Sequence, residues 1–91
     1  MELNEQEITN AVCLHFAERK QVGPEQFDVQ LLWDEDLGFS AEIWMGEKSH
    51  FLVEANLVEA IGRYLLNRHD MRIYSHQVRF ELKDEIVAII E

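Results

Sequence analysis

The sequence predicts an α+β fold, a two-layer sandwich in which one antiparallel sheet carries both helices on one face. Apolar residues recur at helical spacing in two segments, and they alternate with polar residues in the segments between and after them. The alternating segments follow one another through short turns, which is typical of antiparallel pairing. The predicted order is α-β-β-β-α-β-β, in a single domain that spans residues 1–91.

The first helix is expected to start at Asn4, because Asn followed three residues later by Glu7 is a variant of the capping box. It should end near Arg19, where basic side chains suit the negative end of the helix dipole. One stripe of this helix should face the sheet. Its members are Ile8, Ala11, Val12, His15 and Phe16.

Three strands are expected next. Residues 27–33 and 39–45 both alternate and should form a hairpin in which Trp33 pairs with Phe39. A second turn then leads to a short strand at residues 50–53. Strands joined by such short turns are neighbours in one sheet.

The second helix is expected to start at Asn56, since Glu59 repeats the Asn-x-x-Glu spacing, and Glu59 should pair with Arg63 one turn later. Strands at residues 74–82 and 86–90 complete the sheet, and the last is apolar on both faces. Both helices should cover the face lined by Val29, Ile43, Phe80 and Ala88.

Charge excludes some partners. Eight Lys and Arg against eighteen Asp and Glu give a net charge of −10, and the basic residues are scattered. Such a chain is repelled by phosphate backbones and anionic membranes, so we expect no nucleic-acid and no membrane partner. The single cysteine, the acidic N-terminus and the lack of a long apolar run favour a cytoplasmic location.

Three segments carry a resemblance to a known family: Ile8 to His15, Ala17 to Val22, and Leu32 to Asp36. Together they resemble the YxcD-like family of small, uncharacterised acidic proteins from spore-forming Gram-positive bacteria. The resemblance implies a short, single-domain cytoplasmic protein. It assigns no catalytic or binding residue, because the shared segments are ordinary helix and hairpin residues rather than a chemical signature.

His15 is the most suggestive candidate for a binding site. Its position within the apolar stripe points it toward the sheet, and a buried imidazole needs hydrogen-bond partners. Tyr74 and His76 are expected on the inward face of their strand and could supply one. These three residues are a candidate ligand-binding site, and a hydrogen-bonded core histidine is the simpler interpretation.

No metal site or cofactor is expected. The acidic turn Asp34 to Asp36 lacks the spacing of a calcium loop, and no two histidines stand at ligand spacing. Cys13 has no neighbouring base or cation that would activate it. Glycine-rich phosphate loops, His-Glu-x-x-His and Cys-x-x-Cys are absent from the sequence, and no catalytic residue can be assigned.

The sheet face away from the helices carries more apolar side chains than a solvated face should. A four-residue turn at residues 46–49 would place Trp44 beside Phe51. Pairing of Leu82 with Ile86 would point Val87 and Ile89 of the last strand outward. Contiguous exposed apolar residues commonly mark a partner surface. The expected interface consists of Leu32, Trp44, Phe51, Val53, Val87 and Ile89.

Two functions follow from these patterns. The first is a non-enzymatic protein-interaction module, most simply a homodimer that associates through the outer sheet face. The alternative is a small enzyme or ligand-binding domain with a polar site around His15, Tyr74 and His76. The first predicts a dimer in solution and the second a monomer with an open polar cleft.

Overall fold

The computed structural model describes all of residues 1–91 and confirms the α+β class and the predicted order of helices and strands. A short strand that the sequence did not indicate precedes the first helix. The elements are β1 (Glu2–Leu3), α1 (Glu5–Lys20), β2 (Asp28–Asp34), β3 (Gly38–Met45), β4 (Lys48–Val53), α2 (Glu54–His69), β5 (Val78–Leu82) and β6 (Ile86–Ile90), with 3₁₀ turns at Pro24–Gln26 and Ser75–Gln77.

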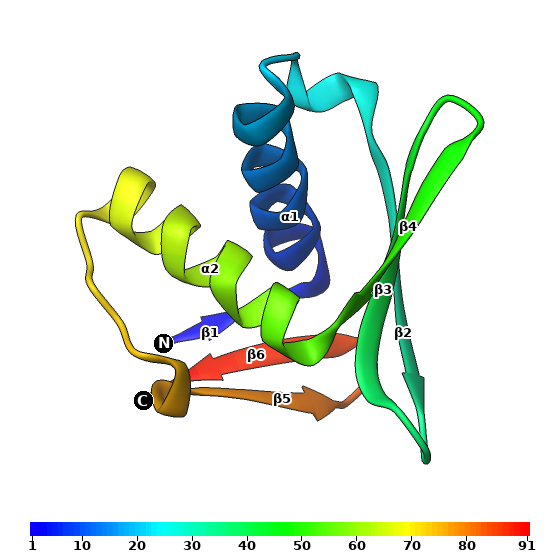
Figure 1. Ribbon diagram of the computed structural model, residues 1–91. Helices are drawn as coiled ribbons and strands as arrows, with labels where there is room; N and C mark the ends of the chain where they lie inside the picture. The colour runs from blue at the N-terminus through cyan, green and yellow to red at the C-terminus, as the bar shows by residue number, and fades with distance from the viewer.

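The strands form two separate antiparallel sheets, where the sequence suggested one. Their orders are β1-β6-β5 and β2-β3-β4. β6 is the central strand of the first sheet, because it pairs with β1 on one side, Leu3 opposite Ala88, and with β5 on the other. Both helices lie in the angle between the two sheets, so they still cover one face of each (Figure 1).

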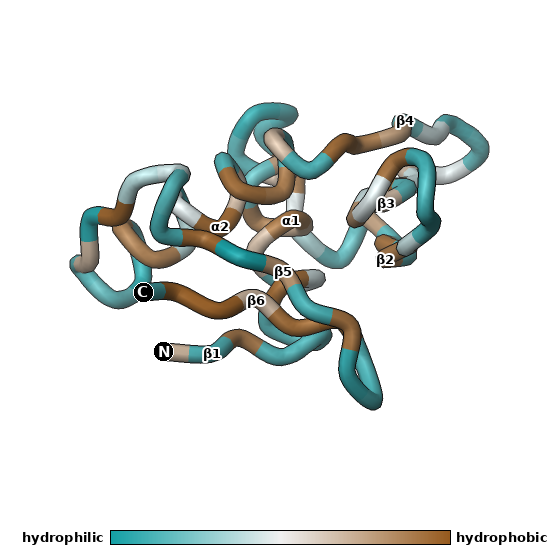
Figure 2. Tube along the Cα trace, turned by 90° about the horizontal axis from the view of Figure 1, so that it is seen from below, coloured by the Kyte–Doolittle hydropathy of each residue, from teal (hydrophilic) through white to brown (hydrophobic).

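One continuous core joins these layers. α1 contacts both β2 and β6, while α2 contacts β3 and β4. The rings of Phe39 in β3 and Phe80 in β5 lie 5.6 Å apart and connect the two sheets. Ile43, Phe80 and Ala88 are buried as expected, and the apolar segments converge on the centre of the molecule (Figure 2). Trp33 pairs with Phe39 as predicted, near the turn of its hairpin, and is 46% exposed.

The start of α1 confirms the predicted capping box. The Asn4 side-chain oxygen accepts a hydrogen bond from the Glu7 backbone N–H at 2.8 Å, and the Glu7 carboxylate accepts one from the Asn4 N–H at 3.1 Å. The predicted start of α2 at Asn56 is wrong. The helix begins at Glu54, and the Asn56 side-chain oxygen accepts a hydrogen bond from the Val53 N–H at 3.0 Å.

Two strand predictions also need correction. β5 begins at Val78 rather than at residue 74, because residues 75–77 form a 3₁₀ turn. Gln77 holds this turn: its side chain accepts from the Tyr74 N–H and donates to the carbonyl of Glu91. The β3–β4 turn has two residues rather than four, since Gly46 has a φ of +63° and such turns favour glycine at their first position.

Candidate functional site

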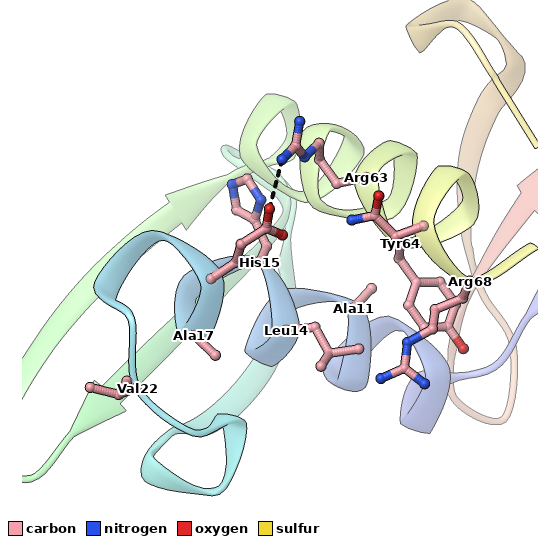
Figure 3. A pocket seen from close by; sticks show the side chains of 10 residues that line it. Ala11, Leu14, His15, Ala17, Val22, Arg63, Tyr64 and Arg68 are labelled. Atoms are coloured by element: carbon pink, nitrogen blue, oxygen red, sulfur yellow. Dashed lines mark hydrogen bonds and ion pairs between the residues drawn. The ribbon is translucent and has the colours of Figure 1, made fainter. Parts of the chain in front are cut away.

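The groove between α1 and α2 holds the candidate His15 (Figure 3). His15 is 9% exposed, so its predicted burial is confirmed. Its nearest charged partner comes from α2 and not from the sheet: the imidazole Nε2 lies 3.8 Å from a carboxylate oxygen of Glu59. Beside it, Arg63 donates to Glu18 at 2.9 Å, which replaces the expected pairing of Glu59 with Arg63.

Burial lowers the pKa of His15 below its usual 6.5. The Glu59 carboxylate opposes this shift, and the guanidinium groups of Arg19 and Arg63 add to it. At neutral pH the ring is therefore uncharged. A neutral imidazole beside an exposed carboxylate is a weak contact, consistent with the 3.8 Å separation.

The other two members of the predicted binding site lie elsewhere. Tyr74 is 61% exposed in the segment before β5, and its ring stacks on that of His76 at 6.1 Å. Neither residue lines the groove that contains His15. The prediction of a shared site is wrong in this respect, because the 3₁₀ turn takes Tyr74 and His76 out of the strand that was to point them inward.

The helix groove contains His15, Glu18 and Tyr64 but no hydroxyl or thiol nucleophile of the serine, threonine or cysteine kind. Its cavity has a volume of about 280 Å³. Besides His15 and Glu18 of α1, it is lined by apolar residues of α1 and the segment after it, Ala11, Leu14, Ala17 and Val22, and from α2 by Arg63, Tyr64, Asn67 and Arg68. No serine, threonine or cysteine lines it. A histidine oriented by a carboxylate needs such a nucleophile within hydrogen-bond reach to act as a general base toward it.

Cys13 lies on the other side of α1, half-buried near β2. Its Sγ lies 4.0 Å from the carbonyl oxygen of Phe27. Burial raises the pKa of the thiol, and the nearby Asp28 carboxylate raises it further. A raised pKa leaves little thiolate at neutral pH, so this cysteine is a poor nucleophile.

The acidic turn after β2 satisfies its own backbone. The Asp34 carboxylate accepts hydrogen bonds from the N–H groups of Asp36 and Leu37, at 2.8 and 2.6 Å. This is the local bonding for which aspartate is favoured in turns. Nowhere in the chain do three or more His, Cys, Asp or Glu side chains come together as metal ligands.

The outer face of the β2-β3-β4 sheet carries four of the predicted interface residues. We call Leu32, Trp44, Phe51 and Val53 the outer patch. Phe51 and Val53 are 50% and 49% exposed, and Leu32 and Trp44 are half-buried. The registers put Phe51 opposite Glu42 and Trp44 opposite Ser49. Trp44 and Phe51 thus share a face but are diagonal neighbours, two residues away from the predicted pairing.

Ser40 lies within the outer patch and was missed from the sequence. It stands between Leu32 and Val53 across the sheet and is only 2% exposed. Its hydroxyl group makes no hydrogen bond with another protein group. The sequence around it, Phe39-Ser40-Ala41, carries no signal of this burial, because Leu32 and Val53 come from the neighbouring strands.

The remaining two predicted interface residues, Val87 and Ile89, belong to the other sheet. Val87 is 4% exposed, so its prediction as a contact residue is wrong. Long charged side chains cover this face: Lys83 reaches across β6 to Glu2 at 3.0 Å, and Arg79 pairs with Glu81 and Glu91. The stems of such side chains shield apolar surface while their charges stay in water.

These features define a small acidic α+β protein with a buried histidine between its helices and an apolar outer face on one sheet. None of its helices has the length and apolar character needed to span a bilayer. A family model described as a protein of unknown function (DUF2653) matches residues 1–85, and the chain belongs to this family.

One relative supports the resemblance found in the sequence. The chain is 26% identical over 91 residues to the uncharacterised protein YxcD of Bacillus subtilis (strain 168). The alignment covers 97% of this chain and 89% of that relative. This similarity and the family match confirm the predicted YxcD-like family. No solved structure gives a significant match.

Proposed function

We propose that this chain is a non-enzymatic interaction module whose partner is a second copy of itself, docked along β4 and the outer patch. One observation carries the proposal. The exposed outer patch includes part of β4, a strand that pairs with β3 on one side only and contains no acidic residue. An unpaired edge presents a row of backbone donors and acceptors to another strand. The patch beside it adds apolar surface to that contact.

The charges on the edge strands indicate which edge two copies can pair along. Each carries −10, and the other three edge strands contain Glu2, Asp28, Asp34 or Glu81. β4 contains Lys48, Ser49 and His50 at the end that follows the β3–β4 turn, and it contains no carboxylate. Repulsion between two copies is therefore smallest along β4, and exposed charges farther away are screened beyond about 8 Å at physiological salt.

Antiparallel pairing of two β4 strands also suits the outer patch better than stacking the two sheet faces. Face-to-face stacking would bring Glu42 and Asp28 of both copies together. Edge pairing about Phe51 instead places the two Phe51 rings side by side and joins the patches into one. Burying about 300 Å² of apolar surface contributes several kcal/mol, at about 25 cal/mol per Å².

Light scattering at matched concentration tests the proposal. We expect the wild type to be a dimer at about 100 μM and Phe51→Glu to be a folded monomer. Tyr74→Glu is the matched control, since Tyr74 is also exposed and the charge change is the same. A monomeric wild type at this concentration, or a dimer that Phe51→Glu leaves intact, contradicts the proposal.

The alternative function, an enzyme or ligand-binding domain built on His15, has less support. Tyr74 and His76 do not line its groove, and the groove has no serine, threonine or cysteine.

A further inference from the structure

A second cavity lies between the last turn of α1 and the β3–β4 hairpin. Its volume is about 80 Å³, and its walls are apolar: Phe16, Phe27, Ile43 and Met45. The Phe16 ring contacts the Phe27 ring at 6.2 Å and stacks on the His50 ring at 6.5 Å, with 23° between the planes. The cavity is thus formed by packed rings, which gives it a fixed shape.

The polar groups around this cavity are all basic. Lys20 at the end of α1, Lys48 at the start of β4 and His50 line it. An adjoining hollow shares Phe16, Lys20 and His50 and adds Arg19. Although the chain has eighteen acidic residues, none lines either cavity.

The positive charges here have no partner within the chain. The ion pairs of the molecule engage Arg63, Arg79 and Lys83, and none involves Arg19, Lys20 or Lys48. The negative end of the α1 dipole accounts for part of this charge, but it is equivalent to only roughly half an elementary charge. The three unpaired cations together carry a charge several times larger than that of the dipole end.

We infer that this cavity binds a small organic anion, a carboxylate that carries a compact branched chain. The chain would occupy the apolar walls, and the carboxylate would lie at the mouth between Lys20 and Lys48. The volume sets the size: about 80 Å³ is less than three water volumes of about 30 Å³ each. A three- or four-carbon branched group fits this space.

This site does not depend on self-association. Lys48 and His50 lie on the helix side of β4, whereas Phe51 and Val53 lie on the outer side. The Phe51→Glu variant should therefore bind the same anion as the wild type. Failure of the dimer and failure of this site can be told apart.

An NMR titration with 3-methylbutanoate tests the inference. We expect saturable shifts confined to residues around Phe16, Met45 and His50. Acetate, which lacks the branched chain, and 3-methylbutanamide, which lacks the charge, should each bind at least about fivefold more weakly, a difference near 1 kcal/mol. Equal binding of the amide, or shifts that never saturate, would overturn it.

Matched variants locate the binding. Lys48→Gln should weaken 3-methylbutanoate binding about fivefold, whereas Arg72→Gln removes the same charge from an exposed cation that lines neither basic cavity and should leave it unchanged. Met45→Trp should abolish binding by filling the cavity. Equal loss in the Lys48 and Arg72 variants would mean that only net charge matters, and the inferred site would be wrong.

Discussion

His15 couples folding to pH. In the folded chain its pKa is lowered by burial, with Arg19 and Arg63 contributing and Glu59 and Glu18 opposing. In the unfolded chain its pKa is near 6.5. Well above pH 6.5 the imidazole is neutral in both states and its contribution to stability is complete. As the pH falls below 6.5 the unfolded state takes up the proton first, so the free energy of unfolding decreases until the folded-state pKa is passed.

We therefore expect His15→Gln to lose stability at pH 7.5, by about 1–3 kcal/mol, because a packed ring is removed. The difference from wild type should shrink at pH 5.5, since the variant has no imidazole to protonate. Urea unfolding of both proteins at the two pH values measures this. If the difference in the free energy of unfolding is the same at pH 7.5 and 5.5, protonation of His15 is not coupled to folding.

Cys13 should be slow to react. Burial and the Asp28 carboxylate raise its pKa, so its thiolate is scarce at neutral pH. We expect iodoacetamide to modify the folded protein much more slowly than the urea-unfolded protein at pH 7.5. Asp28→Asn should speed the folded-state reaction, because it removes the negative charge. Equal rates in folded and unfolded protein would contradict the burial of this thiol.

At the scale of the helix, local hydrogen bonds determine where α1 starts. Asn4→Ala should lower the free energy of unfolding by about 1 kcal/mol, because the Glu7 N–H loses its acceptor. Asn10→Ala is the control, since Asn10 is exposed within the same helix and bonds only the Gln6 side chain. Denaturant unfolding compares them, and equal loss in both variants would rule out a capping role for Asn4.

Elements whose signals are local could be predicted from the sequence. The capping pair Asn4 and Glu7 lies three residues apart, so its pattern contains all the atoms that decide the start of α1. The pattern repeats at Asn56, yet α2 starts two residues earlier, because the backbone leaving β4 brings the Val53 N–H to the Asn56 side chain. The same Asn-x-x-Glu spacing thus occurs with its Asn at the N-cap of α1 and with its Asn as the third residue of α2.

Pairing between distant segments could not be predicted in the same way. A two-residue strand such as β1 has no period, and its place beside Ala88 depends on contacts across almost the whole chain. The candidate site failed for a related reason. Tyr74 and His76 alternate as a strand would, but the Gln77 side chain links the Tyr74 N–H to Glu91 and turns them outward.

At the scale of the whole molecule, charge works against compactness. Ten net negative charges repel one another in the folded state. Four of the ion pairs that offset them involve exposed side chains, as in Arg63 with Glu18 and Lys83 with Glu2, and such pairs contribute little. We expect NaCl from about 10 to 150 mM to raise the melting temperature by screening this repulsion. A flat or falling melting temperature would mean that the surface ion pairs dominate.

The central claim is that β4 is the edge along which two copies pair. Hydrogen–deuterium exchange of the β4 amides at two protein concentrations tests it most directly. Edge amides that point away from β3 should exchange quickly at about 1 μM and become protected at about 100 μM, while those of the other edge strands do not change. The Phe51→Glu variant should show no such protection. Exchange along Lys48–Val53 that is the same at both concentrations would contradict the account.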